Sequence, residues 1–163
     1  MNWAYVHLIL NHVPVLGTLF GLLLLAWGIL RRNDSLQRAA LLTFTLVALV
    51  AIPAYLTGKP AEEAVEHLTG TAGSAIEPHE DAALVSFLAM EVLGALALGA
   101  LLLTRTRFKT AFIVRGALAV AIVTGGLMVW TAQLGGRIRH AELRASDAAQ
   151  SGEREGHAEE HGH

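Results

Sequence analysis

The apolar residues of the chain are gathered into four long runs, and nearly all of its charges lie between these runs or after the last of them. Inside the runs the only charged side chains are Glu91 and Arg115. At about 1.5 Å per residue each run covers about 27 Å or more, which matches the hydrocarbon core of a bilayer. We therefore predict an all-α fold, an integral membrane four-helix bundle, with spans at about 5–30, 39–57, 80–104 and 110–134.

The composition agrees with a membrane protein and excludes several other classes. Of the 163 residues 53% are hydrophobic and 16% are charged, against roughly 25% charged residues in soluble domains. The net charge of -2 and the scattered Lys and Arg give no basic surface for nucleic acid. The chain has no Cys, which excludes disulfides, thiol catalysis, Cys-ligated iron–sulfur clusters and c-type haem attachment. A metal or cofactor would have to be held by His, carboxylate, Met or backbone groups.

The charged loops predict both the domain limits and the topology. The loops after the first and third spans are basic, whereas the loop between the second and third spans carries only Lys59 against six carboxylates. The positive-inside rule then places both termini on the periplasmic or extracellular side of a bacterial inner membrane. The membrane domain covers residues 1–145, and a short surface helix is expected at 60–68. Residues 146–163 form a His- and Glu-rich tail that we expect to be disordered.

Five histidines fall at the predicted outer ends of the spans, and the two predicted cytoplasmic loops contain none. The ends of neighbouring helices in a small bundle lie within about 10 Å of one another, so these imidazoles can converge. Two His from different helices can serve as axial ligands of a haem. We predict a b-type haem for electron transfer at the outer face, and the residues expected to bind it are His7, His12, His79, His140, Gly135 and Gly136.

The spacing of these histidines adds detail. His7 and His12 are about 140° apart around a helix, so they cannot bind one ion together. Pro14 frees the carbonyl of Leu10, which we expect to accept a hydrogen bond from the N–H of a histidine ring. His7 and His79 also take matching places at the start of the first and third spans, a weak internal repeat that indicates two tandem helical hairpins.

Two other functions stay open. A divalent transition metal could be bound or delivered by imidazole and carboxylate ligands, for which the candidates are His67, Glu80, Asp81 and Glu142. Alternatively, the chain is a non-catalytic membrane subunit of a larger complex and binds no cofactor. No nucleophile–base pair, phosphate loop or nucleotide fingerprint is present, so an electron-transfer or binding protein is favoured over a stand-alone enzyme.

Two features of the spans have both a structural and a functional interpretation. Glu91 lies near the middle of the third span, where a carboxyl group handles protons or hydrogen-bonds to Thr43, Thr45 or Thr124 of a neighbouring span. A stripe of small residues in the first span predicts close helix packing, and it also offers a surface for oligomerisation. The stripe consists of Gly17, Gly21 and Gly28.

Four segments carry a resemblance to a known family. They are HLILNHVPVLG in the first span, TGKPAEEAVEH after the second, PHEDAAL before the third and LGGRIRHAE after the fourth. Together they resemble a bacterial family of small four-span proteins of unknown function, over about residues 5–145. The resemblance implies a membrane redox setting, with a membrane or periplasmic redox partner, since members occur joined to Rieske or cytochrome c modules. The matching positions are His7, His12, Gly58, His67, His79, Gly135, Gly136 and His140.

Overall fold

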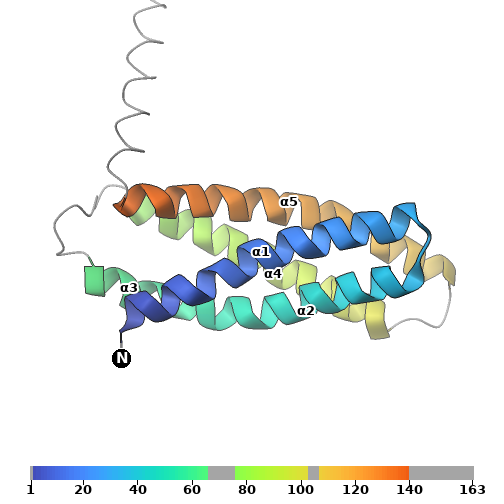
Figure 1. Ribbon diagram of the computed structural model, residues 1–163, viewed down its shortest axis with the longest axis horizontal. Helices are drawn as coiled ribbons and strands as arrows, with labels where there is room; N and C mark the ends of the chain where they lie inside the picture. Colours follow the sequence, from blue (N-terminus) through green and yellow to red (C-terminus); the bar gives the residue numbers. More distant parts are fainter. Residues whose placement is uncertain (1, 66–75, 103–106, 140–163) are drawn as a thin grey trace, which may run out of the picture.

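Four long helices and one short one make up the part of the chain that the structure, a computed structural model, describes: residues 2–65, 76–102 and 107–139. The predicted all-α four-helix bundle is confirmed, because the long helices run alongside one another and α3 continues from the end of α2 (Figure 1). The helices are α1 (Trp3–Leu30), α2 (Asp34–Leu56), α3 (Gly58–Val65), α4 (Ile76–Leu102) and α5 (Arg107–Arg139).

The surface and the interior have the composition expected of a multi-pass membrane protein. Four helical segments are long and apolar enough to cross a membrane: Trp3–Leu30, Asp34–Ala64, Ile76–Leu102 and Phe112–Ile138. Large apolar side chains face outward, as for Phe112 and Leu23, which are 81% and 71% exposed. The interior is instead rich in alanine and glycine with a few buried hydroxyls. Small residues inside and large ones outside suit helices that pack against one another in lipid.

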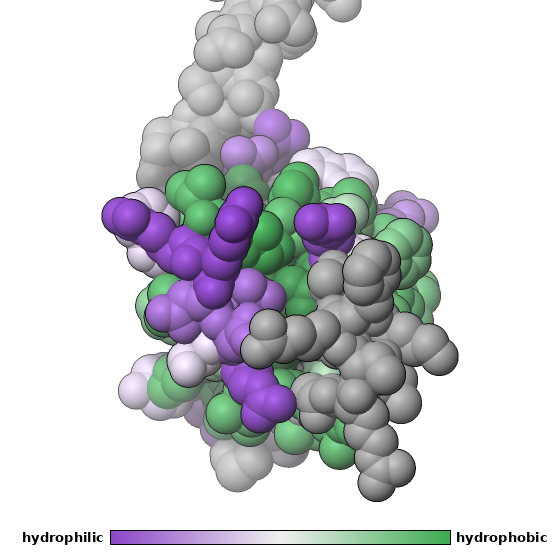
Figure 2. All heavy atoms as spheres, turned by 90° about the vertical axis from the view of Figure 1, so that its right-hand side faces the viewer, coloured by the Kyte–Doolittle hydropathy of each residue, from purple (hydrophilic) through white to green (hydrophobic). Residues whose placement is uncertain are grey.

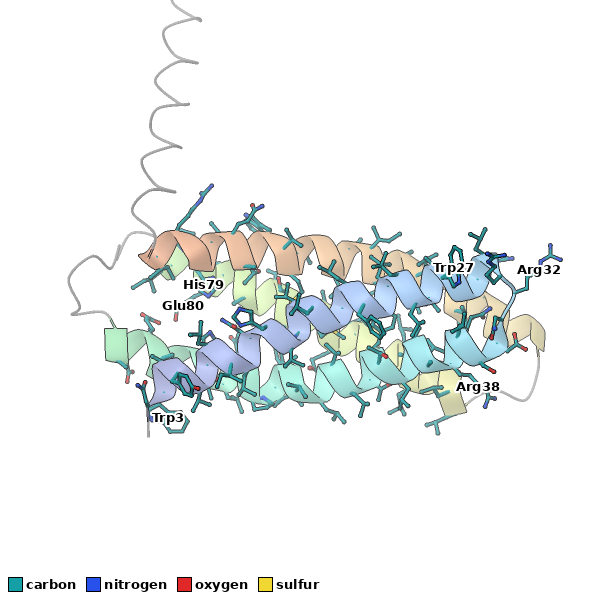
Figure 3. The ribbon with its side chains drawn as sticks, viewed as in Figure 1. Trp3, Trp27, Arg32, Arg38, His79 and Glu80 are labelled. Carbon is teal, nitrogen blue, oxygen red and sulfur yellow. The ribbon has the colours of Figure 1, made fainter. Side chains whose placement is uncertain are left out.

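The two ends of the bundle differ in chemistry. One end, which we call the arginine end, carries the exposed side chains of Arg31, Arg32 and Arg38, and it appears in Figure 2 as a polar cluster. The other, which we call the histidine end, carries Trp3, His79 and Glu80 (Figure 3). This separation of charge agrees with the unequal distribution of basic residues among the loops, from which the topology was predicted.

The glycine stripe of α1 packs against α2 of the same chain. A Cβ atom added to Gly21 would lie 2.6 Å from Cε1 of Phe44, and one added to Gly17 would lie 2.5 Å from Cγ2 of Val47. At Gly28 the added atom would lie 2.9 Å from the backbone nitrogen of Gln37. The interpretation as close helix packing is confirmed, and the stripe is occupied within the chain.

The order of the helices around the bundle decides which of them face each other. Helices α1 and α4 each pack against both α2 and α5, so α1 and α4 lie diagonally opposite. A hydrogen bond crosses this diagonal, from the hydroxyl of Thr18 in α1 to the sulfur of Met90 in α4, at 3.3 Å. Both side chains are fully buried. Thr18 and Met90 therefore mark the inward faces of α1 and α4.

Candidate functional site

His7 is held at the histidine end of α1 by the adjoining end of α2. Its Nδ1 lies 3.0 Å from the carbonyl oxygen of Ala54 and 3.3 Å from the hydroxyl of Thr57. The Thr57 hydroxyl itself lies 2.9 Å and 3.0 Å from the carbonyl oxygens of Pro53 and Ala54. A carbonyl can only accept, so Nδ1 of His7 carries the proton and Nε2 keeps its lone pair.

His79 is held in the same way in the second half of the chain. Its Nδ1 lies 3.1 Å from the carbonyl oxygen of Thr131 in α5. The Thr131 hydroxyl is 2.8 Å from that of Ser86, which is buried on α4 about two turns after His79. Because the Thr131 carbonyl can only accept, Nδ1 of His79 carries the proton and Nε2 keeps its lone pair.

The two rings lie on the inward faces of diagonal helices. His7 precedes Thr18 by eleven residues, and His79 precedes Met90 by eleven residues. Eleven residues are three helical turns plus about 20°, so each histidine shares the inward face of its helix, about 16 Å toward the histidine end. Both rings are partly buried. The structure thus places two imidazoles, from diagonally opposite helices, on the inward faces of those helices at the same end of the bundle.

A glycine lies beside each ring, and the space that it leaves is needed for the ring of His79 but not for that of His7. Gly58 follows the acceptor residue Ala54 by one turn, and a Cβ atom there would lie 3.6 Å from Cε1 of His7. Gly135 follows Thr131 by one turn, and a Cβ atom there would lie 3.0 Å from Cε1 of His79. Each half of the chain therefore contains the same unit of a histidine, an acceptor carbonyl on the next long helix, and a glycine four residues later. This agrees with the tandem hairpins that the weak repeat indicated.

The other predicted haem ligands do not join this pair. His12 is exposed, and its Nδ1 lies 2.6 Å from the carbonyl oxygen of Leu8 one turn earlier. It therefore points away from the side of α1 on which His7 lies, as their spacing required. The expectation that the Leu10 carbonyl accepts a ring proton is wrong, since the acceptors are Ala54, Thr131 and Leu8. Gly136 is half-buried beside Gly135.

The predicted metal ligands are divided between a charged cluster and residues outside the described part. Nζ of Lys59 lies 2.9 Å and 3.0 Å from the carboxylate oxygens of Glu62 and 3.3 Å from that of Glu80. Lys59 therefore bridges the carboxylates of Glu62 and Glu80. Asp81 is exposed. Among the described residues no three His, Cys, Asp or Glu side chains are grouped to hold a metal. The candidates His67, His140 and Glu142 lie outside those residues.

Glu91 does not make the hydrogen bond predicted for it. Its Oε1 atom is enclosed by neighbours and has no hydrogen-bond partner within the residues that the structure describes. The three candidate donors contact backbone carbonyl oxygens instead, each at 3.0–3.4 Å: Thr43 with Ala39, Thr45 with Leu41 and Thr124 with Ala89. Glu91 is half-buried on α4.

Sequence reasoning missed the residues that orient the two rings. Ala54, Thr57, Thr131 and Ser86 carry no ligand chemistry of their own, and two of the contacts are made by backbone oxygen. One signal was present in the repeat, because a glycine stands four residues after each acceptor. The acceptors themselves became visible only when α2 and α5 were placed beside the histidines.

Comparison with models of protein families, with characterised proteins and with solved structures gave no match. The resemblance to the four-span family therefore stays a prediction.

Proposed function

We propose that this protein binds a b-type haem at the histidine end of the bundle, where His7 and His79 would hold it, and transfers electrons. The observation that carries this proposal is the matched pair of imidazoles on the inward faces of α1 and α4, each with Nδ1 hydrogen-bonded to a backbone carbonyl. Nε2 of each ring is left as the ligand atom. A ligating histidine commonly donates its other ring N–H to a carbonyl, which fixes the tautomer and raises the basicity of the ligand.

The donor set fits a haem better than a divalent ion. A structural or catalytic zinc site needs three or four protein ligands, whereas a haem iron needs at most two. The described residues offer two imidazoles on the inward faces of α1 and α4 at one end of the bundle, and no group of three metal-binding side chains. Gly58 and Gly135 lie beside the rings, and neither places a side chain against them. These features favour the haem over the alternative of a bound divalent metal.

Each residue of the site has a definite task in this proposal. The carbonyls of Ala54 and Thr131 orient the rings, and the hydroxyl pair of Ser86 and Thr131 holds the second acceptor in place. The partial burial of His7 and His79 limits the access of water to their ring nitrogens. A haem iron bound there would supply one-electron chemistry, with its potential set by the ligands and their hydrogen bonds.

The topology predicted from the basic loops completes the proposal. It places the histidine end on the periplasmic side of a bacterial inner membrane, where a membrane or periplasmic redox protein can exchange electrons with the site. The charged cluster of Lys59, Glu62 and Glu80 lies at this end, at the rim of the bundle beside His79.

The test is a reduced-minus-oxidised visible spectrum of the detergent-purified protein, together with its metal content. We expect a b-type spectrum that is lost in His7→Ala and in His79→Ala. His12→Ala is the matched control, because His12 lies on the same helix but outside the pair, and it should keep the spectrum. A stoichiometric divalent metal without haem would favour metal binding. If the protein contained neither haem nor a metal, the alternative of a non-catalytic subunit would be favoured. An unchanged spectrum in His79→Ala would refute the assignment of the ligands.

A further inference from the structure

The turn between α1 and α2, at the arginine end, has an arginine where the backbone favours glycine. Arg32 has a φ of 51°, and among the described residues it is the one non-glycine residue with a positive φ. Its N–H donates to the carbonyl oxygen of Ile29 at 3.1 Å. The N–H of Asn33 donates to the carbonyl oxygen of Gly28 at 2.9 Å. These two bonds form a Schellman motif at the end of α1, in which the left-handed residue is usually glycine. Because a side chain costs energy in this conformation, arginine at this position indicates a function for that side chain.

The predicted topology does not explain why the arginine stands at this particular position. A basic residue elsewhere in the turn, for example in place of the exposed Ser35, would serve the positive-inside rule without a left-handed backbone. The interaction of a cation with the end of the α1 dipole is already available to Arg31. The side chain of Arg32 instead projects beyond the end of the bundle (Figure 3). We therefore looked for a group that it could bind there.

Arg31 is held beside it by an aromatic ring. Its Cζ atom lies 4.5 Å from the centroid of the Trp27 ring, a cation–π contact. Neither Arg31 nor Arg32 forms an ion pair or a side-chain hydrogen bond with another residue that the structure describes. Lys59, at the histidine end, is by contrast paired with two carboxylates. Adjacent residues at the arginine end thus carry two guanidinium groups whose N–H donors can bind a group from outside the described chain.

Trp27 lies at the depth of a membrane–water interface. It follows Trp3 by 24 residues, so the two exposed rings are about 36 Å apart along α1, close to the thickness of a bilayer. Such a depth is typical of tryptophan in membrane proteins. Phe20 and Leu23 precede Trp27 by seven and four residues, so these exposed apolar side chains lie on the same side of α1. The arginines therefore lie at the level of lipid headgroups, above a face that suits acyl chains.

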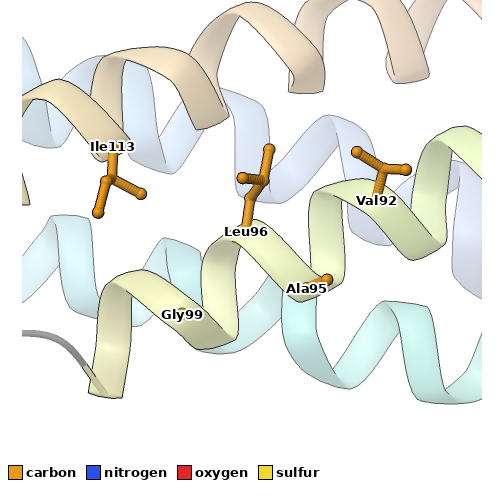
Figure 4. A pocket seen from close by; sticks show the side chains of 5 residues that line it. All are labelled: Val92, Ala95, Leu96, Gly99 and Ile113. Atoms are coloured by element: carbon orange, nitrogen blue, oxygen red, sulfur yellow. The ribbon is translucent and has the colours of Figure 1, made fainter.

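Another outward-facing hollow lacks this combination of charge and apolar surface. It has a volume of about 350 Å³ and is lined by Val92, Ala95, Leu96, Gly99 and Ile113 (Figure 4). None of these residues has a polar side chain, so the hollow can hold an acyl chain but cannot distinguish one headgroup from another. Selection of a headgroup requires charged groups such as Arg31 and Arg32.

We propose that the turn between α1 and α2 binds an anionic phospholipid, with its phosphate at Arg31 and Arg32 and its acyl chains along Trp27, Leu23 and Phe20. A guanidinium group suits phosphate because its planar N–H donors can bind two oxygens at once. Basic residues close to membrane helices bind anionic headgroups in this manner. The cationic group of a zwitterionic headgroup would be repelled by the same two arginines. This site does not depend on the haem proposal, because it lies at the opposite end of the bundle from His7 and His79.

Quenching of Trp27 fluorescence identifies the lipid that lies next to it. Trp3→Phe and Trp130→Phe leave Trp27 as the sole tryptophan, and both replaced rings are exposed, so the fold should be retained. The full chain is placed in phosphatidylcholine bilayers, to which phosphatidylglycerol or phosphatidylcholine with brominated acyl chains is added. Brominated phosphatidylglycerol should be preferred roughly 5- to 30-fold, since each arginine near the surface contributes about a factor of five. Equal quenching by the two lipids would overturn the proposal.

Three variants distinguish this site from a general attraction between a positive surface and negative lipids. Arg31→Gln and Arg32→Gly should each lower the preference about fivefold. Glycine suits the φ of position 32, so Arg32→Gly should stay folded, which unfolding in detergent checks.

Arg38→Gln is the matched control, because Arg38 is also exposed at the arginine end but lies on α2, apart from Trp27 and Arg32 (Figure 3). It should change the preference by less than about twofold. An equal loss in all three variants would show a general surface attraction and refute the site. An unchanged preference in Arg31→Gln and Arg32→Gly would refute it as well.

Discussion

Replacing Gly135 by alanine should weaken haem binding, whereas the same replacement at Gly58 should not. The two glycines take equivalent places in the two halves of the chain, each one turn after the carbonyl that orients a histidine. They differ in the space that they leave. A Cβ atom would lie 3.0 Å from Cε1 of His79 at position 135, but 3.6 Å from Cε1 of His7 at position 58.

The size of the effect follows from these distances. Carbon atoms pack best at about 3.5–4.0 Å, so the ring of His79 would have to move by about 0.5 Å. That shift lengthens or bends the 3.1 Å hydrogen bond from its Nδ1 to Thr131. Loss of such a bond costs about 0.5–1.5 kcal/mol, which corresponds to roughly 2- to 10-fold in affinity. At Gly58 the contact is an ordinary van der Waals distance and requires no movement.

The measurement is a haem titration of the two detergent-purified variants and the parent, followed by absorbance. Thermal unfolding of the haem-free proteins is the control for the fold, and both variants should unfold in a single cooperative transition, as the parent does. An affinity of Gly135→Ala equal to that of Gly58→Ala would refute the reasoning. It would mean that the ring of His79 either moves without a loss of haem affinity or does not ligate the haem.

Two further predictions concern packing and topology. Gly21→Ala places its Cβ 2.6 Å from Phe44 and should destabilise the bundle by about 1–3 kcal/mol. Gly126→Ala is the control: its added Cβ meets nothing within 4 Å, so it should be neutral or slightly stabilising. Unfolding in detergent measures the stability of both variants. Single cysteines at Ser35 and Glu63, exposed at opposite ends of the bundle, should react with an impermeant maleimide from opposite sides of the membrane, with Ser35 inside. Labelling of both from the same side would contradict the four-span arrangement.

The sequence by itself determined the class of the fold. Apolar runs of 18 or more residues favour helices in lipid, because a helix hydrogen-bonds its backbone groups within its own segment and needs about 20 residues to cross the bilayer. The packing role of Gly17, Gly21 and Gly28 followed from their spacing, since residues three, four and seven apart share a helix face. The division between His7 and His12 followed from helical geometry in the same way.

Only the tertiary structure decided which groups meet. The pairing of His7 with His79 depends on α1 and α4 being diagonal, and the order of helices around a bundle is not encoded in any one segment. The carbonyls of Ala54 and Thr131 belong to the backbone that every residue has, so no side-chain pattern marks them as acceptors. For Glu91, the sequence predicted a threonine partner, but each threonine is satisfied by a backbone carbonyl and leaves the carboxyl group without a partner among the described residues. Local spacing fixes the faces of a helix, whereas contacts between faces arise only when the helices pack.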